Sequence, residues 1–299
     1  MLSINTNLMS LNAQRNLATT QSSLAQSMTR LSSGLRVNSA KDDAAGLAIA
    51  ETMTSQVRGQ SVAIRNANDA ISMAQTGEGA LGSISGMLQR MRELAVQAAN
   101  GTNDTDARKN LDTEFKELKA EITRTVDATK FNGTNVLKMS DKITFQVGAN
   151  AGAGGSFSAA DSIEIAKVDI GVSSSDVGKL VATTGSTFQI TDTAASGTTP
   201  AANVASDSLK AIEQIDKALK EVTEKRALFG AAQNRFDNAI SNLRTSVENQ
   251  SAARGRILDA DFATETANLS RSQVLQQAGT AMLQQANAMP NGVLALLRG

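Results

Sequence analysis

The sequence contains no histidine, cysteine, tryptophan or tyrosine, and only two prolines and eight phenylalanines among its 299 residues. Without cysteine, the chain can form no disulfide, no thiolate nucleophile and no Cys-ligated zinc or iron–sulfur site. Without histidine, it has no Ser-His-Asp triad, no imidazole acid–base group and no ordinary zinc site. Only carboxylate or lysine chemistry is left, and we expect no catalysis, no cofactor and no metal.

The charges balance, with 29 Lys+Arg against 29 Asp+Glu and a formal net charge of zero. This balance gives no electrostatic attraction to nucleic acid, and the scarce aromatics offer few platforms for base stacking. It also does little to oppose self-association. No run of 18 apolar residues predicts a membrane span, and residues 1–10 lack the pattern of a cleavable secretory signal. We therefore expect neither a nucleic-acid nor a membrane partner.

Apolar residues recur at alternating spacings of three and four, which is typical of helices that pack in coiled-coil bundles. Near the N-terminus the repeat falls into two groups, and we expect a one-residue slip between Leu11 and Leu24. Near the C-terminus the repeat contains Pro290, which we expect to bend or interrupt the helix. The predicted seam consists of Ile4, Leu8, Leu11, Leu24, Met28, Leu31 and Leu35, and of Leu275, Met282, Met289, Val293 and Leu296.

The middle of the chain predicts more helices and a short β-rich insertion. Helices are expected over 51–100, over 104–127 and from about 202 onward, with Asn100-Gly101 as a helix stop. Short strands are expected near 142–147 and 162–170. The stretch 148–200 is rich in Gly, Ala, Ser and Thr and predicts little core. The fold class is thus mainly α: long antiparallel helices in coiled-coil bundles with a small β-hairpin insertion.

The apolar stripes at the two ends of the chain each need a partner. Pairing of the ends with each other covers one stripe on each, but their Ala, Gly and Ser residues bury little apolar surface. At about 25 cal/mol per Å², such a pair would struggle to offset the entropy of ordering it. We expect the ends to be stable only when packed against other copies of the chain.

Two motifs have a structural and a chemical interpretation. Gly77-Glu-Gly-Ala-Leu-Gly82 fits the dinucleotide-binding pattern G-x-G-x-x-G, but a heptad helix precedes it instead of a strand. Close helix packing is the favoured interpretation. Lys41-Asp-Asp43 could suggest paired carboxylates, but adjacent helical residues point about 100° apart. Helix N-capping or a turn between helices is favoured there.

Six stretches carry specific motifs, three in the N-terminal third of the chain and three in its last 50 residues. They are Ser3-Ile-Asn-Thr-Asn7, residues 30–49 (RLSSGLRVNSAKDDAAGLAI), 88–100 (LQRMRELAVQAAN), 252–263 (AARGRILDADFA), 273–279 (QVLQQAG) and 293–298 (VLALLR). Together they resemble the bacterial flagellins, in a form with a short insertion. The resemblance covers about 1–150 and 203–299, and leaves out 151–202, a region that varies in that family.

The resemblance implies a structural subunit that self-assembles into the extracellular flagellar filament for swimming. Residues 1–44 with 258–299 would form the inner coiled-coil core domain, and 45–147 with 203–257 an outer helical bundle. Residues 148–202 would form a small variable surface insertion. Besides copies of itself, the implied partners are the flagellar type III export apparatus, a secretion chaperone, and the hook–filament junction and cap proteins.

The family resemblance also implies a patch that a Toll-like immune receptor binds. The matching residues are Leu88, Gln89, Arg90, Arg92, Glu93 and Leu94. Packing between subunits is the alternative role for these residues.

Three other functions are alternatives to the filament subunit. A hook–filament junction protein shares flagellin-like terminal helices, but its similarity in the quoted motifs is normally weak. A polysaccharide-binding protein would need aromatic platforms, and the insertion offers only Phe157 and Phe188. Peptidase insertions in some flagellins need His-rich zinc motifs, and histidine is absent here.

Overall fold

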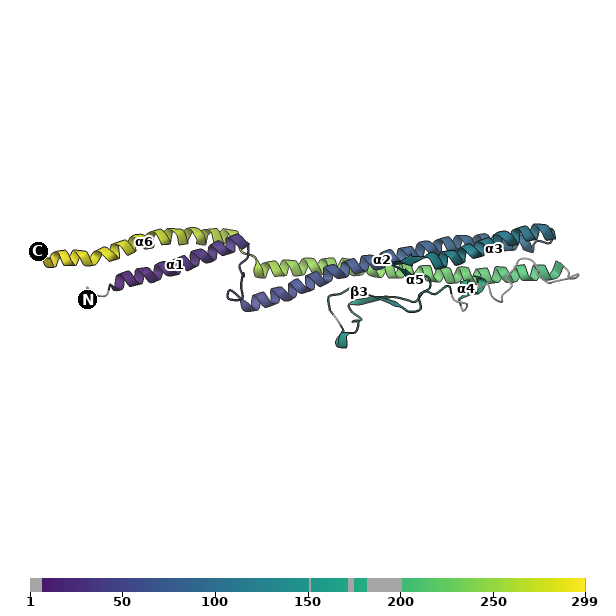
Figure 1. Cartoon of the computed structure of the whole chain (residues 1–299), viewed down its shortest axis with the longest axis horizontal. Helices are drawn as coiled ribbons and strands as arrows, with labels where there is room; N and C mark the ends of the chain where they lie inside the picture. Colours follow the sequence, from purple (N-terminus) through teal and green to yellow (C-terminus); the bar gives the residue numbers. More distant parts are fainter. Residues whose placement is uncertain (1–6, 151, 172–174, 182–200, 299) are drawn as a thin grey trace. The chain divides into compact units, whose positions relative to one another are not determined.

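The structure, a computed structural model, describes residues 7–150, 152–171, 175–181 and 201–298; the side chains of 153, 181, 201–207 and 289–298 lie outside the description. Long helices dominate it, which confirms the predicted mainly α fold class (Figure 1). The helices are α1 Leu8–Ser33, α2 Ala44–Ala99, α3 Thr105–Ala128, α4 Asp176–Val181, α5 Ala201–Leu258 and α6 Phe262–Arg298. The strands are β1 Lys130–Phe131, β2 Thr134–Asn135, β3 Ile143–Gln146 and β4 Ser162–Ile165, with a 3-10 turn η1 at Ala153–Gly155. Contacts divide the chain into two compact units, 1–57 with 248–299 and 58–247.

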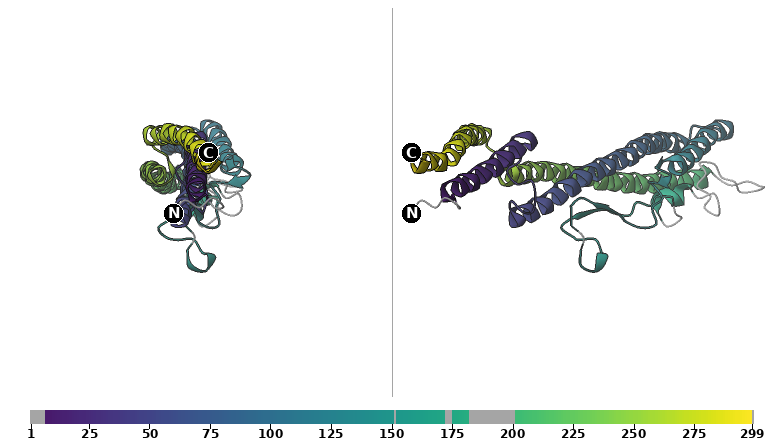
Figure 2. Two further views of the ribbon diagram at one scale, coloured as in Figure 1. Left: turned by 90° about the vertical axis from the view of Figure 1, so that its left-hand side faces the viewer. Right: turned by 60° about the vertical axis from the view of Figure 1, so that its left-hand side comes forward.

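In the first unit, α1 and α6 lie side by side and antiparallel, so that the two ends of the chain are neighbours (Figure 1, Figure 2). The buried or half-buried positions keep one heptad pattern along each helix. They are Ser10, Ala13, Leu17, Thr20, Leu24, Ser27 and Leu31 on α1, and Glu265, Leu269, Ser272, Gln276, Gly279, Leu283 and Ala286 on α6. Small and polar residues make up most of this inner seam, which explains why hydrophobicity alone does not reveal it.

One expectation about these helices is wrong, and a second is wrong in part. The predicted slip in α1 is absent, because the inner seam runs unbroken from Ser10 to Leu31, while Leu8 and Leu11 lie on another, exposed face. Helix α6 runs through Pro290, so the expected interruption is absent, while a bend at Pro290 stays a prediction. A proline removes one backbone donor, and the hydrogen bonds of the neighbouring turns are enough to carry the helix past it.

The end of α1 is fixed by Gly34, whose left-handed backbone (φ 72°) lets its N–H donate to the carbonyl of Arg30 at 2.8 Å. Leu35 is therefore outside the helix, contrary to its place in the predicted heptad series. It pairs instead with Asp259 in an isolated antiparallel bridge. On either side of this bridge, Arg36 N donates to Leu258 O at 2.6 Å and Ala260 N donates to Gly34 O at 2.9 Å.

The Lys41-Asp-Asp43 segment forms a turn and a helix cap, as the sequence predicts. Asp42 accepts hydrogen bonds from the backbone N–H of Asn38 and Ser39 and from the Ser39 hydroxyl. Asp43 accepts from Gly46 N at 2.8 Å and so caps α2. The two carboxylates serve different backbone donors and form no paired site.

The second unit is a helical bundle of α3 and the adjoining parts of α2 and α5, with the hairpins and α4 packed on it. Asn100-Gly101 ends α2 as predicted, and Asp104 caps α3 by accepting from Ala107 N at 2.7 Å. The largest fully buried side chains are Leu81, Ile84, Leu88, Met91, Leu94, Phe115, Ile122, Leu137, Ile170, Leu180, Phe229 and Phe236. Apolar residues at helical spacing thus form one continuous core.

Two antiparallel hairpins lie beside the bundle. The β1–β2 hairpin turns through Asn132 (φ 47°) and Gly133 (φ 82°), as expected for an Asn-Gly turn. Strand β3 pairs with β4 in the register Phe145 opposite Ile163, and the ring of Phe145 packs edge-on against Phe236 with centroids 5.7 Å apart. The expectation of little core in 148–200 is wrong for its described part: Ile163, Ile165, Val168, Ile170, Val177 and Leu180 are all buried in the common core.

The G-x-G-x-x-G motif lies inside α2 with no strand before it, which excludes a dinucleotide loop. A Cβ added at Gly77 would lie 2.8 Å from Phe229 Cζ and 3.0 Å from Val136 Cγ1. Gly79 and Gly82 have open space at the same position. Close packing at the first glycine therefore accounts for the motif.

Candidate assembly surface

The outer faces of α1 and α6 expose large apolar side chains. Eight of them are more than half exposed: Leu8, Met9, Leu11 and Met28 on α1, and Phe262, Val274, Leu275 and Met282 on α6. By contrast, the large apolar residues of the helical bundle in 58–247 are mostly buried. Exposed apolar groups gathered on one element mark a surface that binds another protein. These eight residues point to several sides of the two helices, outside the inner seam, and we call them together the outer face.

Away from Phe262, which follows the exposed Asp261, the outer face carries almost no charge. Between Leu8 and Thr29 the only charged residue is Arg15, and between Thr266 and Leu297 the only one is Arg271. A surface with so little charge can meet a second copy of itself without much electrostatic repulsion or desolvation of ionised groups.

The structure divides the predicted seam between two faces. Leu8, Leu11, Met28, Leu275 and Met282 lie on the outer face. Leu24 and Leu31 are half-buried in the inner seam, and Leu35 lies in the bridge to Asp259. Ile4 lies outside the described residues, and so do the side chains of Met289, Val293 and Leu296.

Three members of the outer face were missed at the level of sequence: Met9, Phe262 and Val274. Met9 falls between Leu8 and Leu11 of the predicted repeat, and Phe262 and Val274 precede its first C-terminal member, Leu275. The inner seam alternates leucines with small and polar residues, and that mixed repeat is the signal that would have assigned these apolar residues to a second surface.

Polar contacts fix the register of α1 against α6. Asn7 Nδ2 donates to the carbonyl of Ala286 at 2.7 Å, and Ser10 Oγ donates to Asn287 Oδ1 at 2.7 Å. Near the other end of the pair, Arg30 Nη1 lies 3.7 Å from the largely buried carboxylate of Glu265. A one-residue shift would separate all three pairs, so the pair is fixed by polar contacts more than by apolar burial.

Asp261 caps the start of α6. Its carboxylate accepts from Ala263 N at 2.9 Å, from Thr264 N at 3.4 Å and from the Thr264 hydroxyl at 2.7 Å. The Thr264 hydroxyl, followed by these backbone donors, lowers the pKa of Asp261 below its usual value. In the turn before α2, the Ser39 hydroxyl and the backbone N–H groups of Ser39 and Asn38 lower the pKa of Asp42 in the same way.

The six residues of the predicted receptor patch lie on α2 but do not share one surface. Leu88 and Leu94 are fully buried in the bundle core. Gln89, Arg90, Arg92 and Glu93 are exposed.

The pKa of Arg90 is raised by its hydrogen bonds to Glu114 at 2.8 Å and to Glu93 at 3.0 Å. The pKa of Arg92 is raised by its bond to Asp216 at 2.8 Å. Both side chains therefore tie α2 to the neighbouring helices.

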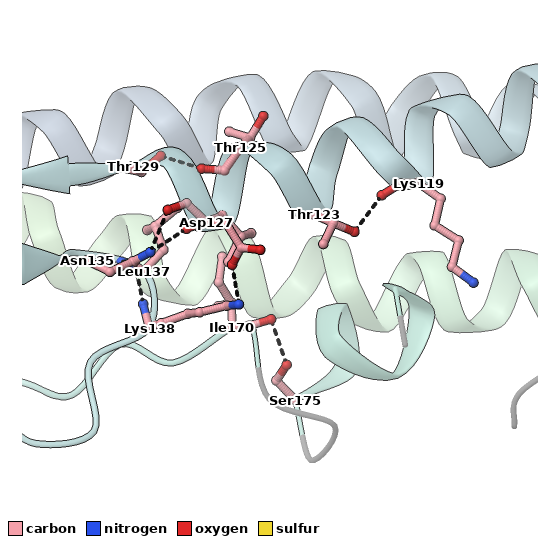
Figure 3. A network of polar contacts seen from close by, with 11 residues as sticks. Lys119, Thr123, Thr125, Asp127, Thr129, Asn135, Leu137, Lys138, Ile170 and Ser175 are labelled. Carbon is pink, nitrogen blue, oxygen red and sulfur yellow. Dashed lines mark hydrogen bonds and ion pairs between the residues drawn. The ribbon is translucent and has the colours of Figure 1, made fainter. Parts of the chain in front are cut away.

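A polar network closes the end of α3 (Figure 3). Asn135 Nδ2 donates to the carbonyls of Val126 and Asp127, and Asn135 Oδ1 accepts from Leu137 N and Lys138 N. Lys138 also pairs with the Asp127 carboxylate. Beside the network, Thr123, Val126, Lys138, Ile170, Gly171, Val177 and Gly178 line a small pocket. This arrangement holds the hairpin on the helix and brings no two catalytic groups together.

Within the described residues, no three acidic side chains gather in a way that could hold a metal ion. No helix in the same part of the chain combines the length and apolar character that crossing a membrane requires. Of the two phenylalanines that could serve as platforms for a sugar, Phe157 is exposed and Phe188 lies outside the described residues. The outer face is therefore the surface with the clearest functional character.

Comparison with known families and proteins identifies the family to which the chain is similar. Residues 4–142 match the bacterial flagellin N-terminal helical region, and residues 212–297 match the bacterial flagellin C-terminal helical region. The chain is 43% identical to a flagellin of Halalkalibacterium halodurans and 39% identical to a flagellin of Bacillus subtilis, each over 99% of both chains. The crystal structure of Bacillus cereus flagellin matches 64% of this chain and 94% of that chain, with 32% identity and a TM-score of 0.46.

Proposed function

This chain belongs to the bacterial flagellin family, a family of structural proteins whose subunits polymerise into the extracellular flagellar filament, and we propose that its outer face makes the contacts between subunits. The observation that carries the proposal is the set of eight large, exposed apolar side chains on a nearly uncharged helix pair. Different copies meet head to tail through such a surface, and contacts that do not close into a ring build an open helical filament.

The proposed layers differ in their bounds from the two compact units, because residues 45–57 and 248–257, assigned to the outer layer, belong to the first unit by contacts. Residues 1–44 with 258–299 form the inner layer, and 45–147 with 203–257 form the outer layer. The bridge between Leu35 and Asp259, where α1 and α5 both end, supports a boundary at this point. Residues 148–202 contribute the insertion, which we propose varies as it does in the family.

Further partners are proposed from the family alone. The chain would leave the cell through the flagellar type III export route and would be held before export by a secretion chaperone at its C-terminal helix. In the filament it would follow the hook–filament junction protein and grow beneath the cap protein. Swimming motility then depends on the filament acting as a propeller.

We also propose the α2 surface as a contact for a Toll-like immune receptor. Its exposed residues are Gln89, Arg90, Arg92 and Glu93, while Leu88 and Leu94 support the helix from the core. A receptor-reporter assay tests this with monomeric Arg90→Ala, for which we expect reduced signalling. Unchanged signalling would show that these residues serve subunit packing alone.

The assembly proposal is tested by substitutions on the outer face. Leu11→Asp and Leu275→Asp place a charge where apolar contact is required, and we expect neither to form filaments after salting-out, as seen by negative-stain microscopy. Leu11→Met and Leu275→Met keep the apolar volume and should polymerise. Far-UV circular dichroism of the monomers checks that the bundle is intact. Normal filaments from both aspartate variants would contradict the proposed contact surface.

A further inference from the structure

The methionine side chains of this protein differ strongly in how much of their surface is exposed. Met9, Met28 and Met282 are 63%, 58% and 59% exposed, and all three lie on the outer face of α1 and α6. In the bundle of residues 58–247, Met73, Met91 and Met139 are at most 4% exposed. Among the methionines whose side chains the structure describes, those that are more than half exposed therefore lie on the surface proposed to contact other subunits.

We propose that oxidation of Met9, Met28 and Met282, three exposed methionines at separate places on α1 and α6, stops assembly of the free subunit when their thioethers become sulfoxides. This inference rests on the proposed role of the outer face in subunit contact. These methionines are open only before docking, because a contact between subunits would cover them. Oxidation would thus act on the subunit and spare the finished filament.

The chemistry needs a two-electron oxidant such as hydrogen peroxide. The methionine sulfur attacks one peroxide oxygen, an S–O bond forms, the O–O bond breaks and the peroxide leaves as water. The sulfur is oxidised by two electrons and gains no net charge. The side chain changes from a flexible apolar group to a polar sulfoxide, which cannot be buried without a hydrogen-bond partner.

The eight residues of the outer face are all apolar, so a sulfoxide that a neighbouring copy buries against them finds no hydrogen-bond donor among them. Exposed polar side chains such as Asn12 and Gln273 lie between them along the two helices. Loss of one buried methionine contact corresponds to about a tenfold change in association. We therefore expect mild oxidation of the free subunit to raise the concentration needed for polymerisation by at least about tenfold.

The first measurement is peptide mass spectrometry of the monomer after brief treatment with hydrogen peroxide. We expect sulfoxide at Met9, Met28 and Met282 to form at least about tenfold faster than at Met73, Met91 and Met139, because burial shields the sulfur. Equal rates at the exposed and buried methionines would overturn the proposal.

The second measurement is seeded polymerisation of treated subunits. The triple variant Met9→Leu, Met28→Leu, Met282→Leu should polymerise after peroxide treatment, whereas the matched variant Met73→Leu, Met139→Leu should stay sensitive. Equal sensitivity of the triple variant and the wild type would overturn the proposal.

A third experiment distinguishes failure of the oxidation proposal from failure of the proposed contact surface. Poor polymerisation of the untreated triple variant would show that assembly depends on these side chains, which supports the contact assignment, and the wild type then decides on oxidation. Treatment of oxidised wild-type subunits with methionine sulfoxide reductases acting on both epimers should restore assembly. A block that persists after the sulfoxides are reduced would overturn the proposal.

Discussion

The backbone of Gly77 on α2 lies directly against the ring of Phe229 on α5, so that an added Cβ would come within 2.8 Å of the ring. Gly77 is buried, and Phe229 is fully buried. A glycine that would weaken an ordinary helix is thus required here by the approach of the two helices.

Gly77→Ala should therefore destabilise the bundle by about 1–3 kcal/mol, the usual range for forcing extra volume into a packed core. Gly79→Ala is the matched control, because the corresponding space at Gly79 is open. It should instead stabilise the helix by about 0.5–1 kcal/mol. Urea unfolding of the monomers measures both. A nucleotide-binding role for the motif would be indicated only if ligand addition raised the unfolding midpoint.

Asn135 joins the end of α3 to the chain that follows β2 through four hydrogen bonds. Asn135→Ala should lower the free energy of unfolding by about 2 kcal/mol, because the carbonyls at the end of α3 and two backbone donors lose this partner. Asn234→Ala, at an exposed position within α5, should change stability by less than about 0.5 kcal/mol. Equal effects of the two substitutions in urea unfolding would contradict the role of Asn135.

The sequence predicts the helices well because their signals are local. Asp104 caps α3, Asn100-Gly101 ends α2, and the Asn132-Gly133 turn closes the first hairpin, each through contacts within a few residues. The terminal pair is different, since its inner seam places small and polar residues such as Ser10, Ser27 and Gly279 between the leucines, and these residues weaken the hydrophobic periodicity. Their partners are more than 200 residues away, and only the fold brings them together.

The sequence predicts only part of the outer face. Leu8, Leu11 and Leu275 are visible as apolar repeats, and they lie on the exposed surface. Leu24 and Leu31 continue the repeat in the sequence but turn toward α6. Two faces of one helix can each show a spacing of three and four, and the spacing does not say which face meets which partner.

Asp261 should titrate below the ordinary aspartate pKa of about 3.9, because the Thr264 hydroxyl and two backbone N–H groups stabilise its carboxylate. Since the folded pKa is the lower one, the cap contributes its stability above the unfolded pKa and loses it as pH falls through the folded pKa. Thr264→Val removes the hydroxyl donor and should raise the pKa of Asp261. Thr266→Val is the control, because Thr266 bonds Ala263 O instead. Carboxyl-carbon NMR titration measures the pKa of Asp261 in both variants. An unshifted pKa of Asp261 in Thr264→Val would contradict the role of the Thr264 hydroxyl.

Deletion of residues 291–299 should impair polymerisation, since Val293 and Leu296 continue the apolar repeat of the C-terminal helix. The bundle of residues 58–247 should keep its stability, because the deleted residues belong to the other compact unit. Urea unfolding and seeded polymerisation of the same sample measure the two properties separately. Normal filaments from the truncated chain would be inconsistent with a role for these residues in assembly.

Residues 1–44 and 258–299 should exchange their amide hydrogens rapidly in the dilute monomer. The inner seam between α1 and α6 buries Ser10, Ser27 and Ser272 and few large apolar groups, while the outer face remains in water. Little apolar burial then opposes the entropy of ordering two long helices. Polymerisation covers the outer face, so protection of the same amides should rise sharply in filaments, as in folding coupled to binding. Mass spectrometry of exchange in monomer and filament tests this directly. Strong protection of both ends in the monomer would mean that the pair is stable by itself and that assembly does not order it.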